Sequence, residues 1–184
     1  MLFRSHVVMM PYFNGAREAA CFVDMVGGRA SVVLLLETAA AVASLGEIVA
    51  VKGVTEIVVG LNDLRISLGL SNLFEVVVSD RMNTISALVR DAGIRFGFGG
   101  LARVDDTTLP VAPDLTYAQY PRLGATSAWL SRSFYRGIGL GEIGTAVHSL
   151  RQRLSYWDNQ PLSAWAGKRD ELALALQRLG GNRL

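Results

Sequence analysis

Two carboxylate residues stand where apolar segments end, a place where α/β proteins often carry out chemistry. Glu37 directly follows the apolar segment 30–36, and Asp63 comes three residues after the apolar segment 55–60. In parallel α/β folds, reactive groups lie just past the carboxyl ends of the strands. A charged side chain at such a place is costly unless it is paired, solvated or bound to a metal ion. Two such carboxylates on neighbouring strands can hold one Mg²⁺ or Mn²⁺ ion, with water and substrate oxygens completing its coordination.

A cation held between these two residues would supply a defined chemistry. It could act as a Lewis acid on a carbonyl or enolate oxygen of a bound substrate. The alternative interpretation is structural, because both residues precede helical segments and acidic side chains favour helix N-termini. The spacing of Glu37 and Asp63 leaves both interpretations open.

The elements that must position these residues can be predicted from hydrophobic patterns. Five mostly apolar segments without clean period-two alternation are typical of strands that are buried on both faces of a parallel sheet. They cover residues 6–12, 30–36, 55–60, 94–100 and 125–131. Helical periodicity occurs between them, at residues 16–26, 38–50, 82–92 and 114–123. This alternation predicts an α/β fold, with Trp129 of the last strand in its core.

The spacing of the strands indicates part of a barrel. Strand starts recur every 30 residues or so, and eight such units make a (β/α)₈ barrel of about 240 residues. The chain has 184 residues, so it has room for about five strands of such a barrel or for an open sheet. Two further helical segments, near 141–156 and 161–179, follow the last strand. We therefore predict a partial (β/α)₈ TIM barrel over residues 1–140 and a C-terminal helical tail over residues 141–184.

The composition of the chain argues against several functional classes. It has 18 basic and 16 acidic residues, and this balance is unlike that of nucleic-acid-binding proteins. No apolar run reaches the roughly 18 residues of a membrane helix, because Glu37 interrupts the longest one. The N-terminus shows no clear signal-peptide cleavage site, and the single cysteine, Cys21, fits a reducing compartment. We therefore expect a cytoplasmic protein that binds neither nucleic acids nor membranes.

Residues 34–70 resemble the HpcH/HpaI aldolase and citrate lyase β-subunit superfamily. The matching features, in order, are the strand end Glu37-Thr38, the Leu-Gly-Glu-Ile segment 45–48, the Gly-Leu-Asn-Asp-Leu segment 60–64, Ser67 and Gly69. Residues 94–134 are compatible with the last two strands of such a barrel. Two positions depart from many aldolases of the family, because Leu61 stands where proline is common and Leu35 where glutamine is common.

The resemblance implies a phosphoenolpyruvate/pyruvate-type barrel in which Glu37 and Asp63 ligate Mg²⁺ or Mn²⁺. It implies a lyase or aldolase that acts on a 2-oxo acid or a related small carboxylate through a metal-stabilised enolate. It also implies a homo-oligomer, because C-terminal helices of relatives pack between subunits. The residues expected to bind the substrate carboxylate, at strand ends or in the loop that feeds a helix N-terminus, are Gly60, Asn62, Arg103 and Arg132.

A second hypothesis comes from what the resemblance lacks. It starts near the fourth strand of a barrel, so about three βα units have no counterpart, and no catalytic residue can be assigned. Relatives take an arginine and a histidine for substrate binding and proton transfer from those units. The chain could therefore be a catalytically incomplete half-barrel that acts as an interaction module, or a fragment of a longer enzyme.

Overall fold

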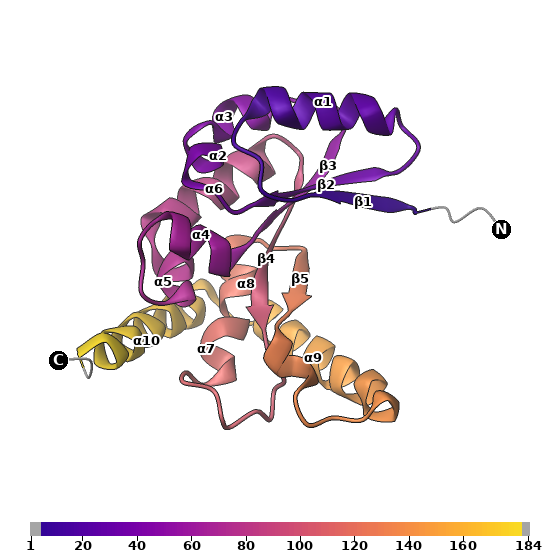
Figure 1. Cartoon of the computed structure of the whole chain (residues 1–184). Coiled ribbons are helices and arrows are strands. Elements are labelled where there is room, and N and C mark those ends of the chain that lie inside the picture. The colour runs from indigo at the N-terminus through magenta and orange to yellow at the C-terminus, as the bar shows by residue number, and fades with distance from the viewer. Residues whose placement is uncertain (1–4, 182–184) are drawn as a thin grey trace.

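Five parallel strands form one curled sheet. In the computed structural model, which describes residues 5–181, the strands are β1 (Val7–Met10), β2 (Ser31–Leu36), β3 (Val54–Val59), β4 (Arg95–Leu101) and β5 (Ser127–Leu130). Each strand pairs with the next one along the chain, in the order β1-β2-β3-β4-β5. The strand direction turns steadily from β1 to β5 (Figure 1). The predicted partial barrel of five parallel strands is therefore confirmed.

Helices connect successive strands and cover one face of this sheet (Figure 1). They are α1 (Ala16–Val26), α2 (Ala39–Ala43), α3 (Leu45–Ile48), α4 (Leu61–Ser67), α5 (Leu73–Val78), α6 (Asp80–Asp91), α7 (Pro113–Tyr117) and α8 (Gln119–Leu123). The prediction for 16–26 is confirmed, whereas the predicted helix 38–50 is two short helices that meet at Ser44. The helical ranges read from the periodicity do not include α4 and α5, because each is too short to show a clear helical period.

The two faces of the sheet have different surroundings. Leu34, Ile57 and Phe96 point into the main hydrophobic core beneath the helices. Because side chains alternate along a strand, the residues directly before and after each of these three face the concave side of the half-barrel. Glu56 lies on this side with Arg95, its partner in the strand register, and their side chains form an ion pair at 3.2 Å.

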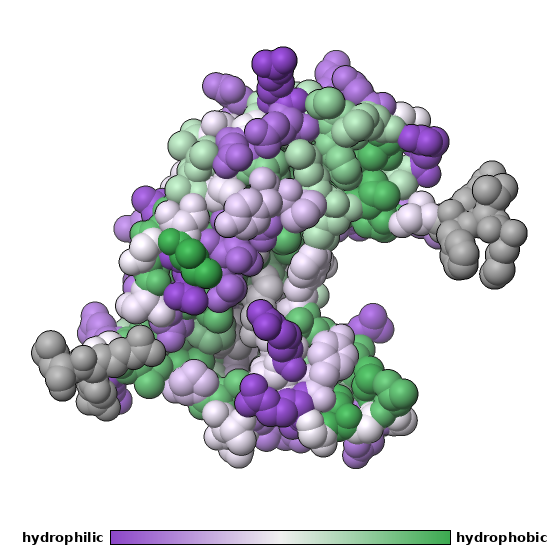
Figure 2. Space-filling model, in the orientation of Figure 1, coloured by the Kyte–Doolittle hydropathy of each residue, from purple (hydrophilic) through white to green (hydrophobic). Residues whose placement is uncertain are grey.

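The half-barrel is open between its two outer strands. Among the described residues, β1 pairs only with β2 and β5 only with β4. The space-filling view is hollowed between the part built on β1 and the part that carries α9 (Figure 2). Val7 on β1 is 51% exposed and Trp129 on β5 is 40% exposed. The prediction that Trp129 is a core residue is therefore wrong, because its side chain lies on the concave face, opposite to Ala128, which packs against the core.

The C-terminal tail consists of two helices, as predicted, namely α9 (Ile143–Asp158) and α10 (Leu162–Gly181). Short 3₁₀ turns at Arg132–Tyr135 (η1) and Leu140–Glu142 (η2) lead into them. Leu172 and Leu176 of α10 pack on Val111 and Leu115. The tail thus covers this apolar surface with the chain's own residues. Homo-oligomerisation stays a prediction. None of the helices found within residues 5–181 is long and apolar enough to span a membrane.

Candidate functional site

The connection after β2 places Glu37 at the carboxyl end of the sheet. Glu37 is only 4% exposed. The next residue, Thr38, is the N-cap of α2, and its hydroxyl accepts a hydrogen bond from the Ala41 N–H at 3.0 Å. The same hydroxyl donates to the Phe13 carbonyl at 2.8 Å. Thr38 therefore does the capping that the structural alternative had assigned to Glu37, whose carboxylate is left for another role.

Two neighbouring segments fix the surroundings of the Glu37 carboxylate. The backbone N–H of Tyr12, in the loop after β1, donates to Oε1 at 2.8 Å. On the other side lies Gly60, where a Cβ atom would stand 2.7 Å from Oε2. Any residue larger than glycine would therefore displace the carboxylate or the strand end. The positions of Glu37 and Gly60 thus depend on each other.

Asp63 follows β3, the strand next to β2 in the sheet. It lies in the first turn of α4, whose N-cap is Gly60, and no side-chain hydrogen bond caps this helix. Ser67, at the end of α4, accepts a hydrogen bond from the Ala39 N–H at 2.8 Å, which ties α4 to the start of α2. The connections after β2 and β3 are therefore held side by side. This contact also gives a physical reason for the serine in the sequence pattern.

The Asp63 carboxylate contributes to the electrostatic surroundings of Glu37. Burial raises the pKa of Glu37, the Tyr12 N–H lowers it, and the negative charge of Asp63 raises it again. Within residues 5–181, neither Glu37 nor Asp63 forms a salt bridge with a basic side chain. Two adjacent carboxylates without a cationic partner repel each other. This arrangement is relieved when a cation lies between them.

A divalent metal ion fits this donor set. Both groups offer carboxylate oxygens, which Mg²⁺ and Mn²⁺ prefer, and Mg²⁺ sites commonly use one or two carboxylates together with water and substrate oxygens. The described part of the chain contains no cluster of three or more histidine, cysteine or acidic side chains suited to a metal ion. A cation held here would therefore depend on Glu37 and Asp63 for its protein ligands.

The other predicted site residues have different surroundings. Asn62 is exposed in the first turn of α4, and its Oδ1 atom accepts a hydrogen bond from Arg65 at 3.3 Å. Arg103 follows β4 and donates to the carbonyls of Phe134 at 3.0 Å and Arg136 at 2.7 Å. Its guanidinium thus connects the loops after β4 and β5. Arg132 is exposed on η1.

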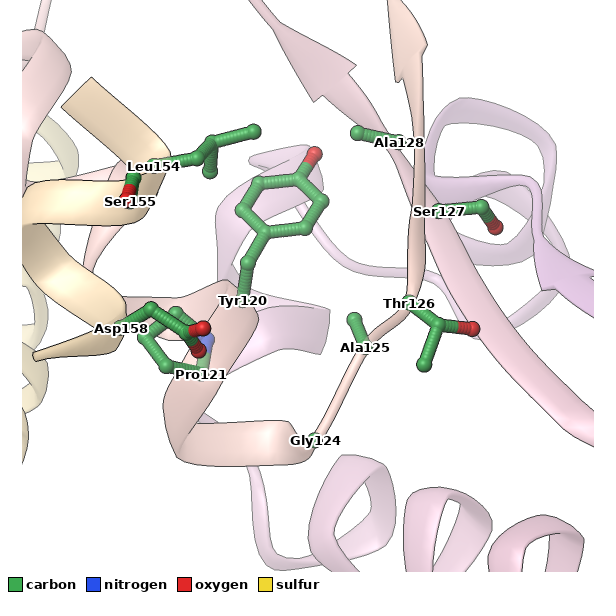
Figure 3. A pocket seen from close by; sticks show the side chains of 10 residues that line it. All are labelled: Tyr120, Pro121, Gly124, Ala125, Thr126, Ser127, Ala128, Leu154, Ser155 and Asp158. Carbon is green, nitrogen blue, oxygen red and sulfur yellow. The ribbon is translucent and has the colours of Figure 1, made fainter. Parts of the chain in front are cut away.

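A cavity of about 450 Å³ lies elsewhere, beside the start of β5 (Figure 3). It is lined by Tyr120, by residues 124–128 and by Leu154 of α9, with Asp158 at the end of that helix. Because β5 begins at Ser127, this cavity is at the amino end of the sheet. Glu37 and Asp63 follow the carboxyl ends of their strands, so the cavity is not part of the candidate site.

These features define the class of protein: an α/β half-barrel with two carboxylates at the carboxyl ends of adjacent parallel strands. The family model for HpcH/HpaI aldolase/citrate lyase matches residues 5–104. The chain therefore belongs to the HpcH/HpaI aldolase/citrate lyase family. A search of curated proteins finds no match.

Solved structures share the fold at low sequence identity. An HpcH/HpaI aldolase/citrate lyase family protein from Burkholderia cenocepacia J2315 is 17% identical, with a TM-score of 0.54 over 82% of this chain and 64% of that chain. RipC from Yersinia pestis is 12% identical, with a TM-score of 0.61 over 86% and 66%. The citrate lyase β subunit from Mycobacterium tuberculosis, complexed with oxaloacetate and magnesium, is 17% identical, with a TM-score of 0.58 over 81% and 61%. The chain thus spans less than two thirds of these relatives.

Proposed function

We propose that this chain carries the metal site of a carbon–carbon lyase or aldolase that acts on a 2-oxo acid or a related small carboxylate. The observation that carries the proposal is the pair Glu37 and Asp63, two carboxylates that follow the adjacent parallel strands β2 and β3 and have no basic partner within residues 5–181. Membership of the family supports it. Related structures are described as complexes with magnesium and oxaloacetate, acetoacetate or pyruvate, which are small carboxylates of this kind.

Each residue has a proposed part in this function. Glu37 and Asp63 would hold Mg²⁺ or Mn²⁺, and the bound ion would supply Lewis acidity that stabilises an enolate of the substrate. Gly60 leaves the room that the Glu37 carboxylate needs. Asn62, Arg103 and Arg132 stay predicted substrate-binding residues together with Gly60. We further propose a cytoplasmic, homo-oligomeric protein, on the cysteine usage and the resemblance already described.

Calorimetric titration with Mn²⁺, with oxalate present as a stand-in for the enolate, tests this proposal. The parent chain should bind Mn²⁺, and oxalate should bind only when the metal is present. Asp63→Ala should abolish both effects while the chain remains folded. Glu47→Gln is the matched control, because Glu47 is an exposed carboxylate on the nearby helix α3. A parent chain that binds neither ligand, or an Asp63→Ala variant that binds both as the parent does, would contradict the proposal.

A second candidate function rests on the open sides of the half-barrel. β1 and β5 each have one free edge within the described residues, and exposed strand edges promote pairing with other chains. We therefore keep the proposal of a catalytically incomplete half-barrel that acts as an interaction module or as a fragment of a longer enzyme. It predicts association by light scattering and no cleavage of oxaloacetate or 4-hydroxy-2-oxo acids. Steady turnover by the purified chain would remove it.

A further inference from the structure

The loop between β1 and α1 is fastened to the residues that follow β2. Two hydrogen bonds join segments that are 25 residues apart: the Tyr12 N–H donates to Glu37 Oε1, and the Thr38 hydroxyl donates to the Phe13 carbonyl, both at 2.8 Å. The Phe13 side chain is fully buried in the main core. The loop and the Glu37-Thr38 pair therefore form one anchored unit.

Tyr12 adopts an unusual backbone conformation within this loop. Its φ of 55° lies in the left-handed region, and no other non-glycine residue of the described chain has a positive φ. This region is unfavourable for a residue with a Cβ atom. The Tyr12 side chain is 67% exposed, so burial of the ring does little to offset the strain. Residues strained in this way are concentrated at functional sites, where the surrounding structure holds them.

The strained conformation directs the Tyr12 N–H at a buried carboxylate. A hydrogen bond from a backbone N–H to an ionised carboxylate is stronger than one between neutral groups. It engages Oε1 of Glu37, whereas Oε2 lies on the side of Gly60. Partners of this kind orient metal ligands, and their loss commonly weakens metal binding.

From this geometry we infer that Tyr12 is a positioning residue, whose backbone N–H holds Oε1 of Glu37 so that Oε2 is presented to the cation. The inference rests on the proposed function, because it concerns the same metal site. It assigns the role to the N–H group and not to the phenol ring. The identity of the side chain at position 12 therefore matters less than the conformation of the backbone there.

An ester substitution isolates this N–H group. Replacing Tyr12 by its α-hydroxy acid analogue exchanges the N–H for an oxygen atom and keeps the ring. The matched control is the same exchange at Asn14, whose N–H donates to Glu18 in the same loop at 3.0 Å. We expect the Kd for Mn²⁺ to rise about tenfold with the Tyr12 ester, and to stay at the parent value with the Asn14 ester and with Tyr12→Phe. An unchanged or lower Kd for the Tyr12 ester would overturn the inference.

Amide hydrogen exchange provides a readout that does not depend on the metal. In the metal-free protein, the Tyr12 amide should be protected in the parent and in Asp63→Asn, and should exchange rapidly in Glu37→Ala. Rapid exchange in the parent would overturn the inference even if Mn²⁺ binds. A protected Tyr12 amide in a parent chain that does not bind Mn²⁺ would instead show that the proposed function fails. The hydrogen bond would then be purely structural, and the positioning role would fail with it.

Discussion

The carboxylates after β2 and β3 differ from those after β4 in their charge partners. Both groups follow the carboxyl ends of strands in the same sheet. After β4, the Asp114 carboxylate forms a two-point ion pair with Arg153 and accepts a hydrogen bond from the Trp157 indole at 3.1 Å. These contacts hold the pKa of Asp114 below its usual range. After β2, Glu37 has a raised pKa, because it is buried and faces Asp63.

The difference separates carboxylates that hold the fold together from those available for chemistry. Asp114 tethers α7 to the tail helix α9, and on the concave face Glu56 is paired with Arg95. Each of these groups has a cationic partner that compensates its charge. Glu37 and Asp63 have none within residues 5–181. A buried carboxylate whose pKa is raised, as that of Glu37 is, is typical of functional sites.

The largest expected effect is the loss of metal affinity when Glu37 loses its charge. Glu37→Gln should raise the Kd for Mn²⁺ by about two orders of magnitude, because it removes one of two anionic ligands. Asp114→Asn should leave that Kd unchanged. Calorimetry on both variants checks the comparison. Equal losses of affinity in the two variants would contradict the assignment of metal binding to Glu37 and of a structural role to Asp114.

Gly60→Ala should give the next largest effect. The added Cβ would stand 2.7 Å from Oε2 of Glu37 and 3.0 Å from its Cβ, so the carboxylate must move. We expect a destabilisation of about 1–3 kcal/mol and a weaker affinity for Mn²⁺. Gly99→Ala is the control, because a Cβ there would meet nothing closer than 3.9 Å. Denaturant unfolding and metal titration of both variants provide the test, and a tolerated Gly60→Ala would contradict the packing of Gly60 on Glu37.

Asp114→Asn should have a smaller effect, on stability alone. It removes an ion pair whose side chains are each about one-third exposed, so we expect a loss of about 1–2 kcal/mol after allowing for solvent screening. Because the pKa of Asp114 is lowered in the folded chain, the contribution of this ion pair to stability depends on pH. It is present above the pKa that Asp114 has in the unfolded chain and is lost as the pH falls through the lower folded value. Unfolding curves at neutral and acidic pH measure it, and an equal deficit of the variant at both would contradict this assignment.

The smallest effect should be a gain in stability of the metal-free chain from Glu37→Gln. Because the folded state raises the pKa of Glu37, the folded chain holds this proton more tightly than the unfolded chain. Ionisation of Glu37 therefore lowers stability as the pH rises through the window between the two pKa values. At neutral pH we expect the variant to melt about 2–4 °C higher, and this gain should vanish in acid. A variant that melts lower at neutral pH would show that the Glu37 charge stabilises the fold.

Much of the fold could be predicted because buried parallel strands have a strong local signal. The apolar segments 30–36 and 55–60 correspond closely to β2 and β3. The first strand was predicted to reach residue 12 but ends at Met10. The next residue, Pro11, has no N–H to donate to the ladder, and Tyr12 then turns the chain with a positive φ. The helical ranges read from the periodicity do not include the short helices α4 and α5, since an amphipathic period needs about 11 residues to be recognised.

The candidate site could be predicted only in part, for a related reason. The neighbourhood of Glu37 and Asp63 follows from a general rule, because carboxyl ends of adjacent parallel strands meet at one edge of the sheet. The contribution of Tyr12 has no sequence signal, because every residue except proline carries the same backbone N–H. The carbonyls that Arg103 contacts belong to Phe134 and Arg136, about 30 residues further along the chain. Contacts of this range depend on the tertiary fold.

We propose that Glu37 and Asp63 together bind one divalent cation. The most direct measurement is a crystal structure of the chain soaked in Mn²⁺, with anomalous differences collected to locate the metal. We expect one strong peak between Oε2 of Glu37 and the Asp63 carboxylate, with the Tyr12 N–H still donating to Oε1. A peak at another place, or Mn²⁺ bound by only one of these two carboxylates, would contradict it.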